Sequence, residues 1–181
     1  MKPDYKDYYH LEKYIRGQVF NNFHERGSIG ATDFFCIIIW KANRAKSKIA
    51  NKLRKVEPDL ELCCNQLTRK LFDAKSAKEK LYVLIKEYDF KLPMGSAILS
   101  ILYPLDFSVY DYRVCEALNS FSSLYHLTSF EKTWTGYNNY IQAVKDCTDP
   151  SLNLIEKDQY LWGKSFYNQL QLDIQSNFKL S

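Results

Sequence analysis

The sequence predicts an all-α protein, and three features support this fold class. Hydrophobic residues make up 46% of the 181 positions and aromatic residues 15%, so the chain can bury a sizeable core. Only 6 glycines and 5 prolines are available for turns, which argues against a turn-rich β-sandwich. Apolar residues recur every three to four positions, which is the period of an amphipathic helix. At this length we expect one domain, or two small lobes at most.

The N-terminal part of the chain predicts two helices. An apolar residue stands at every fourth position from Leu11 to Phe23, which indicates one amphipathic helix. This helix is expected to end in the glycine-bearing segment 27–30. Thr32 is the expected N-cap of a second, buried helix over residues 33–41.

Three more helices are expected before residue 90. A basic helix is expected over residues 46–56, where the apolar positions fall on one face. Pro58 and Asp59 open the next helix, because proline and aspartate favour the start of a helix. The third helix is expected over residues 76–88.

Prolines delimit the following part of the chain. Pro93 begins a short apolar helix that reaches residue 103, and Pro104 breaks it. The apolar stretch 107–110 is compatible with a strand, but four residues alone do not decide this. The last helices are expected over residues 111–121, 130–146 and 152–166.

Positive charge is concentrated in one segment. The formal net charge is only +4, but the chain carries no acidic residue between Lys41 and Val56. The basic residues of this segment are Lys41, Arg44, Lys46, Lys48, Lys52, Arg54 and Lys55. Such a run is suited to tracking phosphates, and the alternative is the solvated face of an ordinary helix.

The cysteines and the N-terminal residues predict a reducing environment. The five cysteines are an odd number without a CxxC pair, and the polar first residues do not resemble a signal peptide. We therefore expect a cytoplasmic protein with free thiols, in which Cys63 and Cys64 fill core volume. The longest apolar run, 34–40, is too short to span a membrane. Scattered histidines argue against a metal site, and no cofactor is expected.

One motif order stands out from these helices. A helix begun by Pro93 is followed by the Pro104 break, and Asp111 then opens the next helix. A carboxylate at a helix N-terminus is favoured in its ionised form by the helix dipole. A simple N-cap is the alternative role for Asp111.

This order resembles the helix–hairpin–helix DNA glycosylase superfamily, which includes the 8-oxoguanine and endonuclease III-like glycosylases. In that family a glycine–hydrophobic–glycine hairpin is followed by a lysine in members with lyase activity, and an aspartate comes about eighteen residues later. These positions fall here on Asp89, Phe90 and Lys91, on Pro93 and on Asp111. The resemblance thus implies that Asp111 is the catalytic carboxylate.

The wider chain is similar to bacterial 8-oxoguanine-glycosylase-like proteins of unassigned substrate, over roughly residues 30–165. The segments that carry this likeness are 35–44, 95–99, 111–113, 134–140 and 158–162. The resemblance implies a single glycosylase-like domain over residues 1–181, with the helix–hairpin–helix region at about 76–121. It implies a two-lobed helical bundle with the active-site cleft between the lobes.

The chain departs from the family at three positions. Asp89 and Lys91 replace the hairpin glycines, which puts a negative charge beside the expected phosphate and a lysine that can offset it. Pro93 replaces the lysine nucleophile and has no amine for Schiff-base chemistry. The resemblance therefore implies a glycosylase without lyase activity.

Further site residues follow from the resemblance together with the charge pattern. The expected DNA-binding residues are Lys41, Arg44, Lys48, Lys52, Lys91, Met94, Gly95 and Arg113. The expected aromatic walls of a pocket for a flipped base are Trp40, Tyr110 and Trp162. For each aromatic the alternative is core packing, and Arg113 has the alternative of an ion pair with Asp106 or Glu116.

The function expected on this basis is hydrolysis of the N-glycosidic bond of a damaged or modified base in double-stranded DNA, which leaves an abasic site. The partner is duplex DNA with a flipped base, and the protein is expected to be a DNA-associated monomer in the cytoplasm. Two alternatives stay open: an inactive DNA-binding module on the same fold, and a helical adaptor for other proteins. The sequence does not identify the base.

Overall fold

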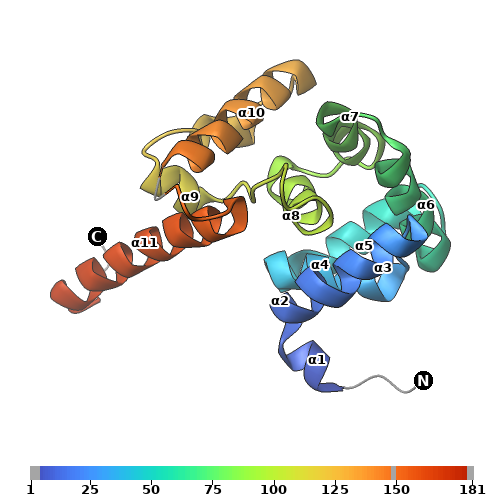
Figure 1. The fold of residues 1–181 in the computed structure, drawn as a ribbon, viewed down its shortest axis with the longest axis horizontal. Helices are drawn as coiled ribbons and strands as arrows, with labels where there is room; N and C mark the ends of the chain where they lie inside the picture. Colours follow the sequence, from blue (N-terminus) through green and yellow to red (C-terminus); the bar gives the residue numbers. More distant parts are fainter. Residues whose placement is uncertain (1–4, 148–149, 179–181) are drawn as a thin grey trace. The chain divides into compact units, whose positions relative to one another are not determined.

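Every regular element in the described part of the chain is helical, which confirms the all-α prediction (Figure 1). The computed structural model describes residues 5–147 and 150–178. The chain divides into two compact units, and the boundary between them falls between Tyr103 and Pro104.

The first unit consists of short helices that follow one another closely. Its α-helices are α1 (Tyr5–Tyr9), α2 (Leu11–Tyr14), α3 (Phe20–Arg26), α4 (Ala31–Ala42), α5 (Lys46–Arg54), α6 (Leu60–Asp73), α7 (Ala77–Tyr82) and α8 (Leu92–Leu102). A π-helical stretch (Ile15–Val19) joins α2 to α3, and a second one (Val83–Glu87) extends α7. A 3-10 turn (Asn43–Ala45) joins α4 to α5.

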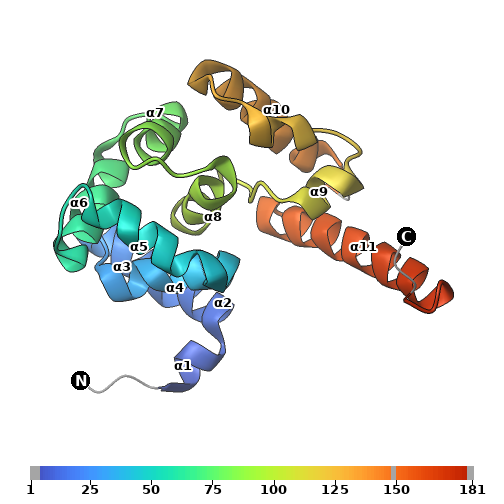
Figure 2. The ribbon, with the colours of Figure 1, turned by 180° about the vertical axis from the view of Figure 1, so that it is seen from behind.

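The core of the first unit is built around α4 and α8. Helix α4 packs against both α6 and α8, and its Ile37 and Ile38 side chains are fully buried. Every residue of α8 except Pro93 is buried. Helices α7 and α8 lie side by side in both ribbon views (Figures 1 and 2).

The start of α4 differs from the prediction, because Gly30 rather than Thr32 is its N-cap. The Ala31 N–H donates to a Glu61 carboxylate oxygen at 2.7 Å, so a side chain of α6 satisfies the first turn of α4. A Cβ atom on Gly30 would lie 1.9 Å from another Glu61 oxygen. Glycine therefore admits the carboxylate, and a local threonine cap is not needed.

Other helix starts follow the local signals. The Asp59 carboxylate accepts hydrogen bonds from the N–H groups of Glu61 and Leu62 and caps α6. Ser76 and Glu79 form a reciprocal capping box at the start of α7. Both starts were predicted, because a cap needs only residues within one turn of each other.

The second unit contains three α-helices, α9 (Tyr112–Ala117), α10 (Phe130–Asp146) and α11 (Leu154–Gln175), with a 3-10 turn (Ser122–His126) after α9, all within the residues that the structure describes. Helix α11 packs against both α9 and α10, and both ribbon views show α9 between the other two (Figures 1 and 2). The predicted boundaries of α10 are confirmed.

The boundaries of α9 and α11 differ from the prediction. Helix α9 ends at Ala117 and not at residue 121, because Asn119 and Phe121 adopt left-handed conformations that end a helix. Helix α11 continues to Gln175 instead of ending at residue 166, since neither glycine nor proline interrupts residues 167–175.

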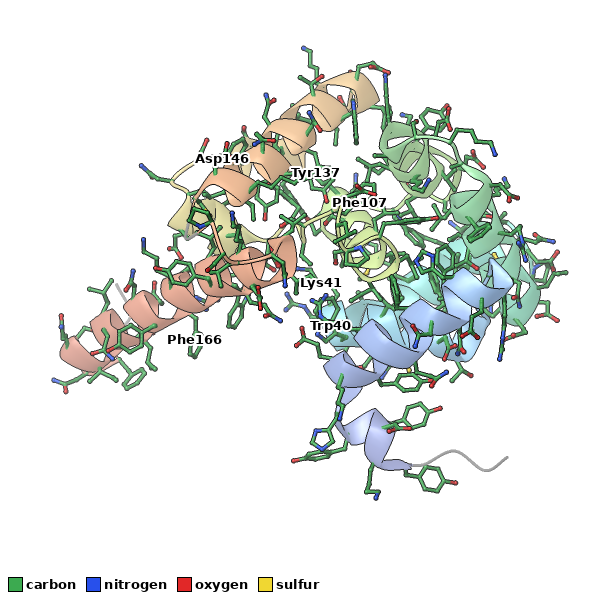
Figure 3. The ribbon with its side chains drawn as sticks, in the orientation of Figure 1. Trp40, Lys41, Phe107, Tyr137, Asp146 and Phe166 are labelled. Atoms are coloured by element: carbon green, nitrogen blue, oxygen red, sulfur yellow. The ribbon has the colours of Figure 1, made fainter. Side chains whose placement is uncertain are left out.

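The stretch 107–110 is buried and forms neither helix nor strand within the described residues. Buried tyrosines of α10 bind its backbone instead. The Tyr137 hydroxyl donates to the Ser108 carbonyl at 2.5 Å, and the Tyr140 hydroxyl donates to the Val109 carbonyl at 2.6 Å. The Phe107 and Tyr137 rings stack with centroids 6.5 Å apart (Figure 3). Segment 107–110 is thus held by hydroxyl groups in place of a neighbouring strand.

We predict that Tyr140→Phe lowers the free energy of unfolding by about 1–2 kcal/mol, because it leaves the Val109 carbonyl without its donor in a buried site. Urea denaturation measures the difference. Tyr167→Phe is the matched control, because this side chain is 60% exposed and its hydroxyl is accessible to water. Equal stability of the two variants would show that the Tyr140 hydroxyl does not support segment 107–110.

Candidate nucleic-acid interface and candidate catalytic carboxylate

The connection between the α7 extension and α8 is a tight turn over residues 88–91. Asp89 adopts a left-handed conformation with φ of 53°, whereas Lys91 is extended with φ of −81°. Phe90 is 1% exposed, and its N–H donates to the Leu84 carbonyl at 2.9 Å. The position where the resemblance places the first glycine therefore needs a left-handed residue, which aspartate tolerates. The second glycine position makes no such demand.

Lys52 of α5 binds this turn directly. Its Nζ lies 2.6 Å from a carboxylate oxygen of Asp89 and also donates to the Asp89 backbone carbonyl. The Asp89 side chain is 81% exposed, whereas that of Lys52 is 18% exposed, so the carboxylate lies on the solvent side of the pair. The hydrogen bond from Lys52 lowers the pKa of the Asp89 carboxyl below its ordinary value.

The charges of Lys91 and Lys48 also lower the pKa of Asp89. We call Lys48, Lys52 and Lys91 the lysine cluster. Lys48 and Lys52 stand four residues apart on α5, and the apolar residues of the same helix, Ile49 and Leu53, are buried. The basic run and the hairpin position were predicted separately. The structure brings Lys48 and Lys52 of the basic run beside Asp89 of the hairpin position.

The start of α8 adds to the positive character of the turn. Lys91 is the N-cap of α8 and makes no capping hydrogen bond with its side chain, and Pro93 stands in the first turn. The N-terminus of an eleven-residue helix carries a partial positive charge that attracts anions. Together with the lysine cluster it can hold a phosphate group.

Met94 and Gly95 have a packing role in the structure. Both are buried, and their N–H groups bind the Lys91 carbonyl at 3.0 Å. The Gly95 position lies against α7 and its extension, and a Cβ there would meet Leu84 at 3.6 Å. The predicted contact of these two residues with DNA therefore gains no support from their positions.

Three other predicted residues lie near the end of α4, outside the lysine cluster. Trp40 and Lys41 are half-buried in the last turns of α4 (Figure 3), and Arg44 is exposed in the following 3-10 turn. The Arg16 guanidinium lies over the Trp40 ring, 5.3 Å from its centroid. This contact covers one face of the indole. The described contacts therefore give Trp40 a packing role.

Asp111 is the N-cap of α9, as the sequence predicted. Its Oδ1 accepts a hydrogen bond from the Arg113 N–H at 3.0 Å, and the residue is half-buried. The α9 start thus holds the carboxylate in a defined orientation. That Asp111 faces a cleft between two lobes stays a prediction.

Arg113 lies among aromatic rings in the described part of the second unit. Its guanidinium carbon is 5.1 Å from the ring centroid of Tyr112, 5.4 Å from that of Trp162 and 5.3 Å from that of Phe166. Trp162 and Phe166 stack with an interplanar angle of 10° and are both partly exposed. The sequence analysis missed Phe166, although its spacing of four from Trp162 on one helix was the available signal.

Two residues near Arg113 in the sequence, Glu116 and Tyr110, form hydrogen bonds with other groups of the second unit. The Glu116 carboxylate accepts a hydrogen bond from the Ser165 hydroxyl. Tyr110 is 3% exposed, and its hydroxyl donates to the Phe121 carbonyl at 2.9 Å. The structure thus brings Arg113 and Trp162 together in the second unit, and it places Tyr110 in the core of that unit.

The cysteines do not form a reactive or metal-binding group in the described residues. All five are free thiols and only Cys147 is partly accessible. Burial raises the pKa of Cys64 to about 12, which keeps this thiol protonated near neutral pH. No set of three or more His, Cys, Asp or Glu side chains in the described segments could hold a metal ion. None of the described helices is both long enough and apolar enough to cross a membrane.

Comparison with protein families, with curated proteins and with solved structures finds no match for this chain. The interpretation of the site therefore depends on its own geometry and charges.

We predict that Lys52→Met returns the pKa of Asp89 toward its ordinary value of 3.8. The carboxyl carbon shift of Asp89, followed by NMR during an acid titration, measures this. Lys55→Met is the control, because it removes a lysine near the end of α5 that does not act on Asp89. An unchanged Asp89 titration in the Lys52 variant would contradict the ion pair.

The same shift has a consequence for stability. A lowered folded-state pKa stabilises the folded state above the unfolded-state pKa, and this contribution is lost as the pH falls through the folded-state pKa. The wild type should therefore exceed Lys52→Met in stability at neutral pH by an amount that shrinks in acid. Denaturation series at several pH values measure the shrinkage.

Proposed function

We propose that this protein binds the phosphate backbone of duplex DNA with the lysine cluster and the turn 88–91, and that it hydrolyses an N-glycosidic bond with Asp111 as the catalytic carboxylate. The observation that carries the proposal is the convergence of Lys48, Lys52 and Lys91 on the turn before α8.

The chemistry of this surface favours a polyanion. Lysines bind phosphates as point charges, and the partial positive charge of the α8 N-terminus favours an anion at the same place. Contacts of this kind fix the position of a protein on DNA without reading its sequence. We therefore expect affinity that depends strongly on salt and little on sequence.

Asp111 meets the needs of N-glycosidic bond hydrolysis. Departure of the base leaves positive charge on the sugar, and a carboxylate about 4 Å away stabilises that charge by on the order of 4 kcal/mol at an effective dielectric of 20. The same group can orient or deprotonate the attacking water. Pro93 supplies no amine, so the product is an intact abasic site.

A DNA-binding module without catalytic activity is the second candidate. It is favoured by the hydrogen bond from the Arg113 N–H to Asp111, because a cap role alone accounts for an aspartate at this position. The two candidates share the DNA-binding surface and differ only in base release.

We predict that Lys48→Gln combined with Lys91→Gln weakens binding to duplex DNA and lowers the slope of log K against log salt by about two units, since each lost phosphate contact removes about one unit. Fluorescence anisotropy with a labelled duplex at several salt concentrations measures the slope. Duplexes of unrelated sequence should give the same loss.

Lys75→Gln combined with Lys132→Gln is the matched control. These exposed lysines lie before α7 and in α10, so the control changes the net charge equally while sparing the lysine cluster. If both double variants lose the same affinity and slope, the cluster is an ordinary solvated surface and the DNA interface must be sought elsewhere.

We predict that Asp111→Asn lowers the rate of base release by on the order of 10³-fold, which corresponds to roughly 4 kcal/mol of transition-state stabilisation. Asparagine is also a good N-cap, so the variant removes the charge while it keeps the start of α9. DNA affinity should stay the same or rise slightly. The assay incubates the protein with duplexes that carry modified bases and detects the released base by mass spectrometry.

Asp106→Asn is the control, because it removes an exposed carboxylate five positions earlier in the same unit. Base release by the Asp111→Asn variant at the wild-type rate would leave Asp111 as a helix cap only. Wild-type protein that binds DNA but releases no base from any duplex would support the second candidate. Trapping of a covalent adduct with borohydride would contradict the absence of Schiff-base chemistry.

A further inference from the structure

Asp89 is an unusual residue for a phosphate-binding turn. Its carboxylate is 81% exposed and lies over an ammonium group that is only 18% exposed. A phosphate that approaches Lys52 from solvent therefore meets the Asp89 carboxylate first. A carboxylate and a phosphate oxygen seek the same kind of charge-assisted hydrogen bond from a lysine.

We propose that Asp89 is an intramolecular competitor for DNA phosphate, which occupies Lys52 in the unbound protein and gives it up when DNA binds. The inference rests on the proposed DNA binding and adds regulation of the same surface. In the unbound state the lysine cluster then presents Lys48 and Lys91, while Lys52 contributes only after Asp89 has moved away.

The ion pair is suited to such an exchange. Exposed salt bridges contribute little to stability, so a carboxylate that is largely in solvent can leave at small cost. Lys52 keeps a second bond to the Asp89 backbone carbonyl, which does not depend on the side chain. The lysine therefore stays beside the turn when the carboxylate departs.

A purely conformational role for Asp89 makes a different prediction. The left-handed conformation at φ of 53° suits asparagine and glycine as well as aspartate. If conformation alone matters, Asp89→Asn should leave DNA affinity unchanged. Under the competitor proposal the same substitution frees Lys52.

The experiment compares wild type and Asp89→Asn by fluorescence anisotropy with one labelled duplex over a range of salt. We expect Asp89→Asn to bind more tightly with a salt slope close to that of wild type, because Lys52 contacts phosphate in both complexes but no longer has to leave Asp89 first. The gain in affinity should therefore stay similar across the salt range, whereas a gain from an additional phosphate contact would shrink as the salt concentration rises. Asp89→Gly should show the same gain, which covers the case in which the Asp89→Asn variant folds poorly.

Glu87→Gln is the matched control. This carboxylate pairs with Lys70 at 2.6 Å, two residues before Asp89, and its removal raises the net charge by the same amount. A gain in affinity equal to that of Asp89→Asn would show a general charge effect and overturn the proposal.

Lys52→Met, made in both backgrounds, completes the test. It should weaken binding in both backgrounds, and more in Asp89→Asn than in wild type, so that the gain of Asp89→Asn disappears. A tighter Asp89 variant whose gain survives Lys52→Met would contradict the exchange of partners. Wild type that binds DNA with no gain in either Asp89 variant would overturn this inference alone, whereas no DNA binding by any of these proteins would overturn the proposed function.

Discussion

The tight turn between the α7 extension and α8 is the constraint on which the first unit depends. Phe90 is buried within it, Asp89 supplies its left-handed step, and Lys52 of α5 binds both the side chain and the backbone of Asp89. These contacts join three helices at one point. They also place basic side chains beside the start of a helix that is otherwise buried, so a structural joint and a candidate phosphate site are made of the same residues.

The second unit contains a buried backbone segment, residues 107–110, that belongs to no sheet among the described residues. Buried backbone carbonyls need donors, and the hydroxyls of Tyr137 and Tyr140 supply them to Ser108 and Val109. The held segment leads directly into Asp111 at the start of α9. Helix α10 thereby fixes the chain segment that precedes the candidate catalytic carboxylate. This role accounts for part of the high tyrosine content.

The lysine cluster and Asp111 differ in how strongly the structure supports a functional role for them. The three lysines of the cluster act on a single carboxylate, that of Asp89, so the cluster has an excess of positive charge. For this reason phosphate binding is the stronger part of the proposal. Asp111 already has a structural role as a cap, and catalysis would be a second use of the same carboxylate. The Arg113 guanidinium lies near the rings of Tyr112, Trp162 and Phe166 and so joins α9 to α11, the longest of the described helices.

The sequence by itself determined the all-α class, the starts of α6 and α7, the cap position of Asp111 and the acid-free run on α5. These features depend on helical period and on residues within a turn of each other. Only the tertiary structure decided that Glu61 satisfies the start of α4, that Arg113 lies on aromatic rings and that Lys52 pairs with Asp89 across 37 positions. Such pairings are set by how the helices pack, and because many distant side chains could make an equivalent contact, local propensity does not select among them.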